Sequence, residues 1–373
     1  MSIETELAPV VAGFMFSGRW IGVEEIRTGH INRTYRLTFV PPNGGKAEYI
    51  LQRISSQAFK RPDLVMENVL RVTEYLRRAI EARGESSKNR VLRVIPARDG
   101  APMLTDAQGG AWRAYNFVDG AHSVDAVESP AQFREVGRAF GEFQTMLSDF
   151  PIGQLHDTIP HFHDTVRRVA AFEAAVARDA CGRAANVADE IAFVRARAAG
   201  MGRIVGMIEE GELPLRVTHN DTKSNNVMVD DVTGRALCVV DLDTVMAGSS
   251  LYDFGDAIRF GASTAAEDET DLSRVRLDME LFTAFSDGYI SQTARGLSAA
   301  ELEHLPLSAL VMTYEVGMRF LTDHLDGDVY FRIGHPGHNL ERARCQFRLL
   351  EDMEARRGEM EAVTRALVTR YKG

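Results

Sequence analysis

The chain has 373 residues, of which 45% are hydrophobic and 26% are charged, and its formal net charge is -10 at pH 7. This composition is typical of a globular protein, and the length favours two domains or lobes. Nucleic acid is not an expected partner, because phosphate backbones are bound by clustered cations and this acidic sequence has no long Lys/Arg run.

Three further features of the sequence concern where in the cell the protein is located. No run of about 18 apolar residues occurs, so neither a membrane-spanning helix nor a membrane partner is expected. The N-terminal segment lacks the basic residues that precede the apolar core of a signal peptide. Cys181, Cys238 and Cys345 are widely spaced and odd in number, which favours free thiols in a reducing compartment. We therefore expect a cytoplasmic protein.

The first part of the chain predicts a small β-rich lobe. Its strand-like runs are residues 35–40, 49–54, 91–96 and 112–118. The segment from Pro41 to Gly45 is a strong turn signal between the first two runs. One helix is expected near residues 63–79. Asp119-Gly120 follows the last strand and is interpreted as a hinge.

After the hinge the pattern is mainly helical. Ser129-Pro130 is expected to start a helix, because proline is tolerated at the first helical position. Apolar residues then recur at every third or fourth position. Ser298 and Glu301 form a capping-box pattern before another helix. Further helices are expected at residues 163–177, 188–210, 272–291 and 340–354.

The most informative stretch reads VTHNDTKSNNVMVDDVTGRALCVVDLD and sets His219, Asp221 and Asn226 in the spacing H-x-D-x-x-x-x-N. A predicted hairpin follows, and its second strand ends at Asp241. This order suits phosphoryl transfer from a magnesium-bound nucleotide. The carboxylate of Asp221 can accept the proton of an attacking hydroxyl, and oxygens of Asn226 and Asp241 can hold Mg²⁺. Asp243 is close enough in sequence to assist at the metal.

These residues resemble the signature of the aminoglycoside phosphotransferase and choline kinase superfamily, which is related to the protein kinases. The resemblance covers nearly the whole chain in order. It implies a bilobal, protein-kinase-like α+β fold, with a nucleotide-binding lobe of residues 1–118 and a catalytic and acceptor-binding lobe of residues 119–373. It also implies Mg²⁺ as the metal and ATP as the co-substrate.

Two nearby residues are expected to support the catalytic loop. His219 is interpreted as a brace of that loop. Asp253 begins a literal D-F-G, the metal-binding motif of protein kinases, but no predicted strand leads into it, whereas a strand ends directly at Asp241. We therefore expect Asp241 to hold the metal and Asp253 to accept hydrogen bonds from backbone N–H groups.

The nucleotide end departs from the protein-kinase pattern. Only one glycine stands where a glycine-rich loop would be, and Gly29, Asn32 and Thr34 are expected beside the phosphates. The phosphate-binding Lys of the third strand is absent, and Gln52 or Arg53 is the candidate replacement. Only one of the two can serve, because neighbouring strand residues point to opposite faces.

Two further expectations complete the nucleotide site. Glu67, on the predicted helix, is a candidate partner for Arg53. Adenine is expected to lie against the backbone of Asn116, Phe117 and Val118. The missing Lys and the single glycine also keep a second class of function open, a nucleotide-binding module that regulates a partner.

Within the superfamily, the strings GHINRTY, YILQRI, TIPHFHD and MTYEVGMRFLTDHLDGDVYF are similar to those of the N-acetylhexosamine 1-kinases. This resemblance implies a small-molecule sugar acceptor, phosphorylated at the anomeric hydroxyl of N-acetylglucosamine or N-acetylgalactosamine. It also implies that Arg319 and Tyr330 contact sugar hydroxyls, with His30 approaching from the small lobe.

The alternative acceptor is cationic. An ammonium group is best bound by a pocket of negative charge, and Asp323, Asp326 and Asp328 could provide one. An aminoglycoside, choline or amino-alcohol kinase therefore remains open beside the sugar kinase.

Overall fold

The structure is a computed structural model that describes residues 3–26 and 31–373. Its first part is a six-stranded antiparallel sheet in the order β1-β2-β3-β6-β4, with β5 paired to β6. The strands are β1 (Arg19–Ile26), β2 (Arg33–Val40), β3 (Ala47–Arg53), β4 (Val94–Ile95), β5 (Leu104–Thr105) and β6 (Ala111–Asn116). The predicted turn after Val40 joins β2 to β3.

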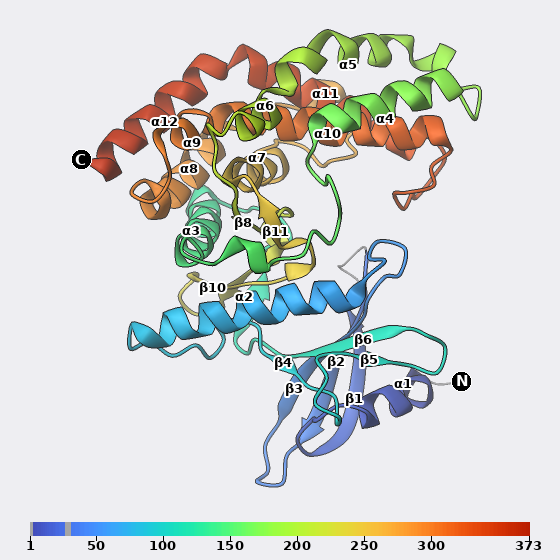
Figure 1. Ribbon diagram of the computed structural model, residues 1–373, viewed down its shortest axis with the longest axis vertical. Helices are drawn as coiled ribbons and strands as arrows, with labels where there is room; N and C mark the ends of the chain where they lie inside the picture. Colours follow the sequence, from blue (N-terminus) through green and yellow to red (C-terminus); the bar gives the residue numbers. More distant parts are fainter. Residues whose placement is uncertain (1–2, 27–30) are drawn as a thin grey trace.

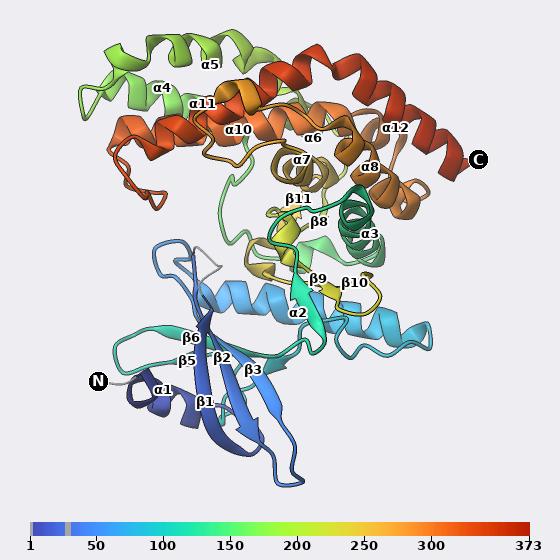
Figure 2. The same cartoon turned by 180° about the vertical axis from the view of Figure 1, so that it is seen from behind.

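Two helices flank this sheet. α1 (Ile3–Ala12) contributes Leu7 to an apolar cluster with Tyr35 and Leu37 of β2. α2 (Pro62–Ala82) buries residues at the three- and four-residue spacing of an amphipathic helix, among them Val65, Val69 and Val72. Figures 1 and 2 show that α2 lies between the sheet and the helical remainder of the chain.

The second part is mainly helical, as predicted (Figure 1). Its α-helices are α3 (Pro130–Met146), α4 (Thr165–Arg178), α5 (Ala188–Met201), α6 (Arg203–Glu209), α7 (Ser250–Gly261), α8 (Met279–Thr293), α9 (Ala299–Glu303), α10 (Leu305–Asp326), α11 (His338–Ala355) and α12 (Arg357–Lys372). The short 3-10 turns are η1 (Ile152–Gln154), η2 (Ala184–Val187), η3 (Ser224–Asn226), η4 (Leu242–Thr244) and η5 (Leu272–Arg274).

Two small antiparallel sheets lie between the large sheet and the helices. One has the order β10-β9-β7 and the other pairs β11 with β8. Their strands are β7 (Ala121–Ser123), β8 (Arg216–Thr218), β9 (Val227–Asp230), β10 (Ala236–Val239) and β11 (Met246–Gly248). The predicted hairpin is β9 and β10. These short strands bring together the residues of the H-x-D-x-x-x-x-N motif and the end of β10.

Helix α3 packs behind the loop that carries the H-x-D-x-x-x-x-N motif. Ser129 caps it by accepting a hydrogen bond from the backbone N–H of Gln132, as its Ser-Pro start predicts. It packs closely on α8, because a Cβ added at Gly288 would lie 2.0 Å from the carbonyl oxygen of Arg134. Phe140 and Phe143 of α3 are buried.

The fold class is confirmed, while some predicted boundaries are wrong. The helix expected at residues 188–210 is divided into α5 and α6 at Gly202. The helix expected at residues 272–291 begins only at Met279, because Asp278 caps it by accepting from two backbone N–H groups. The D-F-G sequence lies inside α7, a helix whose residues are nearly all buried.

The chain passes from β6 to β7 through Asp119 and Gly120, and Gly120 has a φ of 67°. The division into lobes of residues 1–118 and 119–373 remains a prediction. An apolar cluster includes Leu76 of α2, Phe143 of α3 and Cys238 of β10, so the two parts share buried contacts. Among the described residues, no helix is both long and apolar enough to cross a membrane.

Candidate active site

The H-x-D loop follows β8, and its backbone is held by a buried carboxylate. Asp253, in the first turn of α7, accepts hydrogen bonds from the backbone N–H of His219 at 2.9 Å and of Asn220 at 2.8 Å. Burial raises the pKa of Asp253 to about 6. Asn220 has a φ of 64°, so the loop turns sharply just before Asp221.

His219 is fully buried and links this loop to the strand that leads to Asp241. Its Nε2 donates to the carbonyl oxygen of Val240 at 2.9 Å, and its Nδ1 accepts from the backbone N–H of Asp221 at 3.3 Å. The ring packs edge-on against Phe140 and Phe143. With both ring nitrogens engaged by backbone, His219 fixes the position of the loop.

Asp221 and Asn226 lie together. The amide nitrogen of Asn226 donates to the backbone carbonyl of Asp221 at 2.8 Å and approaches its Oδ2 at 3.3 Å. Nothing among the described residues donates to the amide oxygen of Asn226. That oxygen is therefore available as a hard ligand for a divalent cation.

Lys223, which sequence reasoning did not single out, is paired with Asp221. Its Nζ lies 2.9 Å from Asp221 Oδ1. Burial opposes ionisation of Asp221, but the charge and hydrogen bond of Lys223 outweigh it and hold the pKa of Asp221 below its usual range. The attraction of Asp221 in turn raises the pKa of Lys223. The signal in the sequence was a lone Lys two residues after the proposed base.

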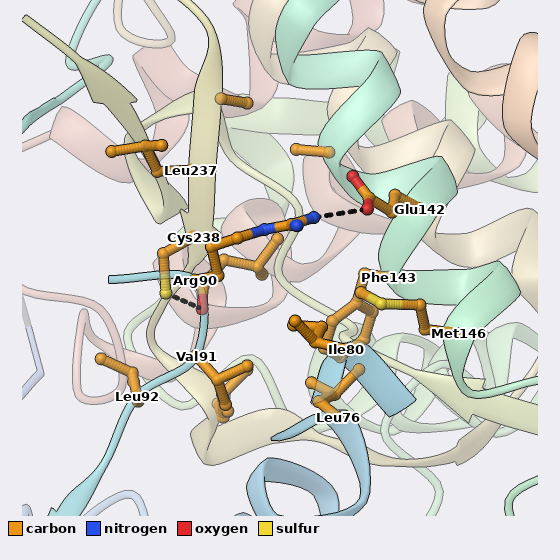
Figure 3. Close-up of a pocket in the computed structure, with 14 residues that line it drawn as sticks. Leu76, Ile80, Arg90, Val91, Leu92, Glu142, Phe143, Met146, Leu237 and Cys238 are labelled. Carbon is orange, nitrogen blue, oxygen red and sulfur yellow. Dashed lines mark hydrogen bonds and ion pairs between the residues drawn. The ribbon is translucent and has the colours of Figure 1, made fainter. Parts of the chain in front are cut away.

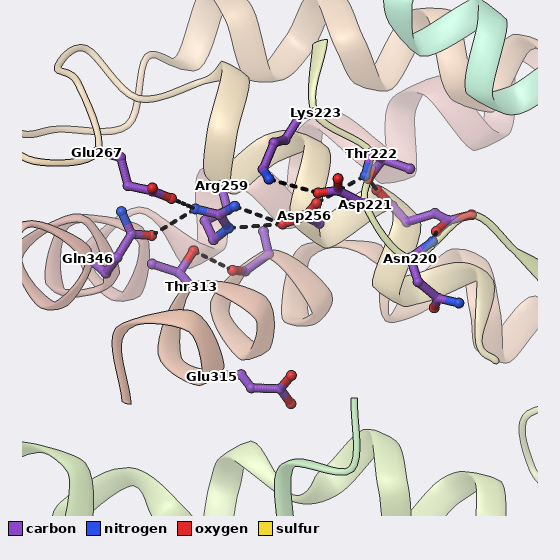
Figure 4. Close-up of polar contacts among 12 residues, drawn as sticks. Asn220, Asp221, Thr222, Lys223, Asp256, Arg259, Glu267, Thr313, Glu315 and Gln346 are labelled. Atoms are coloured by element: carbon purple, nitrogen blue, oxygen red, sulfur yellow. Dashed lines mark hydrogen bonds and ion pairs between the residues drawn. The ribbon is translucent and has the colours of Figure 1, made fainter. Parts of the chain in front are cut away.

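A buried network braces the loop from behind (Figure 4). The backbone N–H of Thr222 donates to Asp256 at 3.0 Å. Asp256 pairs with Arg259 at 2.9 Å, and Arg259 pairs with Glu267 at 2.7 Å. Arg259 is only 3% exposed. Because unpaired buried charges are costly, this arrangement holds α7 and the loop in one geometry.

Asp241 stands at the turn after β10 with a φ of 58°. Burial, and then the charges of Asp243 and Asp221, raise the pKa of Asp241 to about 7. The negative charges that act on Asp241 favour a cation beside it. Within the described residues, no group of three or more His, Cys, Asp or Glu side chains is arranged to hold a metal alone. Asn226 and Asp241 could hold a divalent cation only together with further oxygen ligands, such as those of phosphate and water.

Asp243 differs from its expected place at the metal. It forms a buried ion pair with Arg113 of β6, and its Oδ2 accepts from Asn32 at 2.7 Å. Both carboxylate oxygens thus have partners from the first part of the chain. The reason is Arg113, a fully buried cation that needs a counter-charge. In the sequence, this ion pair is indicated by a charged residue, Arg113, in the middle of a mainly apolar strand.

The strand residues Gln52 and Arg53 separate as expected to opposite faces. Gln52 accepts from Arg113 Nε at 2.9 Å and donates to Thr34 at 3.0 Å, which places it with the Asp243 group. The guanidinium of Arg53 lies 5.9 Å from the centre of the Trp112 ring.

The suggested pair of Arg53 with Glu67 is wrong. Glu67 instead binds Arg71 at 2.9 Å and His156 at 2.6 Å. Helix α2 supplies Arg71 one turn after Glu67, so the local pair forms in place of the long-range one.

Other nucleotide predictions are less defined by contacts. Asn116 ends β6, and its side-chain oxygen accepts from the backbone N–H of Arg93. The backbone N–H of Phe117 donates to the backbone carbonyl of Glu48 at 3.3 Å. Val118 is buried. The predicted residues Gly29 and His30 lie outside the described residues.

The two predicted acceptor residues come together. The guanidinium of Arg319, on α10, lies 5.8 Å from the Tyr330 ring, 5.4 Å from the Phe162 ring and 5.5 Å from the Phe331 ring. Tyr330 is 58% exposed. Arg319 is itself partly exposed, and a partly exposed arginine among aromatic rings can bind a polar ligand through its N–H groups.

The three acidic residues considered for a cationic pocket are occupied. Asp323 accepts from the backbone N–H groups of residues 329, 330 and 331 and thereby holds the Tyr330 segment. Asp326 pairs with Arg178, and Asp328 pairs with Arg183. Asp326 and Asp328 are thus paired with arginines, and the oxygens of Asp323 are taken up by neutral N–H donors.

A small cavity lies elsewhere, between α2, α3 and β10 (Figure 3). It is lined mostly by apolar side chains, with an ion pair of 2.7 Å between Arg90 and Glu142. Its volume of about 30 Å³ is room for about two water molecules. None of the predicted site residues lines it, so it is not the nucleotide or acceptor site.

Residues 22–289 match the model of the phosphotransferase enzyme family. The chain belongs to this family. Three solved structures show how far the fold of this phosphotransferase is shared. A microcompartment-associated aminopropanol kinase is 18% identical, with a TM-score of 0.61 over 96% of this chain and 98% of the other.

Two further structures agree with this likeness. The amicoumacin kinase hAmiN, in complex with AMP-PNP, Ca²⁺ and Ami, is 14% identical, with a TM-score of 0.57 over 93% of each chain. A choline kinase from Cryptosporidium parvum Iowa II is 14% identical, with a TM-score of 0.57 over 99% of this chain and 100% of the other. The phosphotransferase thus has the fold of these kinases over nearly its whole length.

Proposed function

We propose that this phosphotransferase is an ATP-dependent kinase of a small molecule, and that its acceptor is the anomeric hydroxyl of an N-acetylhexosamine. The observation that carries the kinase assignment is the loop in which Asp221 contacts both Lys223 and Asn226. The family and the kinase fold support it, as does the nucleotide analogue AMP-PNP in one of the compared structures.

Asp221 is the proposed base. Its carboxylate accepts the proton of the acceptor hydroxyl as the acceptor oxygen bonds to the γ-phosphorus and the bond from that phosphorus to the ADP oxygen breaks. Lys223, 2.9 Å from Asp221 Oδ1, keeps the carboxylate ionised. His219 and Asp253 keep the base in position through the loop backbone. Most of the catalysis is positioning and charge neutralisation.

Asn226 and Asp241 are the proposed ligands of Mg²⁺, which would neutralise charge on the phosphates of ATP. Gln52 is the proposed replacement for the missing strand Lys, with Asn32 and Thr34 beside it, and the buried Arg113 holds Gln52 in place. Asp243 is the counter-charge that holds Arg113 there.

The acceptor side favours a neutral sugar. Arg319 and Tyr330 offer N–H and O–H donors to hydroxyl groups, and the rings around them offer apolar faces for a sugar ring. Asp326 and Asp328 are paired with arginines, and the oxygens of Asp323 are already bound by backbone N–H groups, so none of the three is open to an ammonium group. This occupied acidic set speaks against the amino-alcohol alternative, although the compared structures include kinases named for aminopropanol and choline.

An assay of ADP release with Mg-ATP tests the function. The acceptors are N-acetylglucosamine, N-acetylgalactosamine, glucose, choline, aminopropanol and an aminoglycoside. We expect turnover with the N-acetylhexosamines, and phosphorus NMR should show the phosphate on the anomeric oxygen. Turnover confined to the amino alcohols would contradict the acceptor, and binding of Mg-ATP without turnover of any acceptor would favour a regulatory module.

A further inference from the structure

A second guanidinium accompanies Arg319. Arg168, on α4, donates through two of its nitrogens to the backbone carbonyl of Phe162, at 2.9 and 3.3 Å. The ring of the same Phe162 lies 5.4 Å from the guanidinium of Arg319. The two cations therefore both lie next to Phe162. Burial, and then the charge of Arg319, lower the pKa of Arg168.

The nearby carboxylates are already engaged. Glu315, one turn before Arg319 on α10, is fully buried and binds His163 at 2.8 Å and Thr165 at 2.6 Å. Asp164 caps α4 and pairs with Arg167 at 3.0 Å. Among the residues that the structure describes, neither Arg168 nor Arg319 forms an ion pair. Glu315 attracts both Arg168 and Arg319, but one carboxylate compensates only one of the two guanidinium charges, so one positive charge is left over in this region.

This region adjoins the catalytic loop. The rings of Phe162 and His163 lie 4.4 Å apart, and Nε2 of His163 lies 3.3 Å from the carbonyl oxygen of Asn220. Asn220 directly precedes Asp221. Helices α4 and α10 pack against each other on this side (Figure 1), away from the sheet that carries Arg113. The surplus charge is therefore on the acceptor side of the proposed base.

We propose that Arg168, together with Arg319, is a specificity-determining residue that excludes acceptors carrying an ammonium group. The inference rests on the proposed function and makes it more specific: the enzyme distinguishes an N-acetylated hexosamine from the free amino sugar. The amide of the first is neutral, whereas the amine of the second is charged at neutral pH. Repulsion between unit charges about 8 Å apart, at an effective dielectric constant of about 20, corresponds to roughly thirtyfold in affinity.

Matched variants of neighbouring arginines test this role. The measured quantity is the ratio of kcat/KM for N-acetylglucosamine to kcat/KM for glucosamine. Arg168→Gln keeps a donor for the carbonyl of Phe162 and removes the charge, so we expect the ratio to fall about tenfold, less than the full repulsion because Arg168 is partly solvated. Arg168→Lys keeps the charge and should keep the ratio. Arg167→Gln unpairs Asp164, whose negative charge acts on Arg168, so this variant should lower the ratio in the same direction as Arg168→Gln.

The wild-type enzyme provides a measurement that needs no variant. Salt screens repulsion between partly exposed charges. Raising the ionic strength from about 0.05 M to about 0.5 M should therefore lower the ratio of kcat/KM for N-acetylglucosamine to kcat/KM for glucosamine. A ratio that changes neither with salt nor in Arg168→Gln, in an enzyme that phosphorylates N-acetylglucosamine, would overturn the role of Arg168 alone. Failure to phosphorylate any N-acetylhexosamine would instead overturn the proposed function, and the inference with it.

Discussion

At the scale of single residues, the chemistry depends on a few charged side chains whose environments differ. Asp221 is held ionised by Lys223, whereas the pKa of Asp241 is raised to about 7 by burial and by its acidic neighbours. Asp221 is thus ionised and has a free charge state for a proton from a hydroxyl, while a cation bound at Asp241 would relieve the repulsion from its acidic neighbours. Opposite environments for paired carboxylates are a recurring feature of acid–base sites.

Lys223 gives the first prediction. Replacing it with Ala should lower kcat by about 10- to 1,000-fold, because a preorganised cation beside the base is removed from the transition state. KM for the acceptor should change little, since Lys223 is paired with Asp221 and not with the Arg319 group. Steady-state kinetics measure both quantities. Lys88→Ala, on an exposed turn, is the control, and equal kinetics in the two variants would show that Lys223 has no catalytic role.

The residue scale also shows where the sequence was sufficient. Spacing alone identified His219, Asp221, Asn226 and Asp241 as one group, because a hairpin must return its second strand to the place where the first began. Spacing could not identify Arg113 or Arg168. Their neighbours come from distant segments, such as Asp243 for Arg113, and those contacts exist only after folding.

At the scale of elements, α3 and α8 form the support behind the catalytic loop. Their close approach depends on glycines, and a Cβ at position 288 would lie 2.0 Å from the backbone oxygen of Arg134. Phe140 and Phe143, which hold the His219 ring, project from α3. A shift of this helix would therefore reach the loop that carries Asp221.

A pair of Gly→Ala substitutions tests this packing. Gly288→Ala should reduce the free energy of unfolding by at least about 1–3 kcal/mol, because backbone cannot move aside as a flexible side chain can. Gly200→Ala, in α5, meets no atom within 4 Å and should be neutral or stabilise by about 0.5–1 kcal/mol. Chemical denaturation gives both values. Equal stability of the two variants would mean that α3 and α8 can separate without cost.

Element boundaries were less predictable than element types. Residues 188–210 show one continuous helical pattern, yet the chain turns at Gly202 to fit α5 and α6 over the core. Helix α7 was not expected, since its residues are buried almost without exception and its polar side chains, Asp253, Asp256 and Arg259, bind other parts of the protein instead of facing solvent. Tertiary packing determines both the break at Gly202 and the position of α7, and the local sequence pattern does not indicate either of them.

At the scale of the whole molecule, the sheet and the helical part are joined by an apolar cluster and by charge pairs. The cluster includes residues of α2, α3 and β10, and the ion pair of Arg113 with Asp243 connects β6 to the turn after β10. The proposed division after residue 118 therefore separates parts that stabilise each other. We expect them to unfold together.

The two tryptophans make this testable without substitutions. Trp20 and Trp112 both lie in the large sheet, in β1 and β6, whereas most helices lie in the second part. Tryptophan fluorescence and far-UV circular dichroism thus report on different parts of the molecule. Their denaturation midpoints should coincide. Separate midpoints would show that the two parts are energetically independent.

The central claim is that Asp221 is the base of a phosphoryl transfer from Mg-ATP. The most direct measurement compares turnover of N-acetylglucosamine and binding of Mg-ATP in the wild type and in Asp221→Ala. Turnover in the variant should fall by at least about 100-fold, the lower range of general base catalysis, while the dissociation constant for Mg-ATP stays within about threefold. Wild-type turnover in Asp221→Ala would contradict the claim.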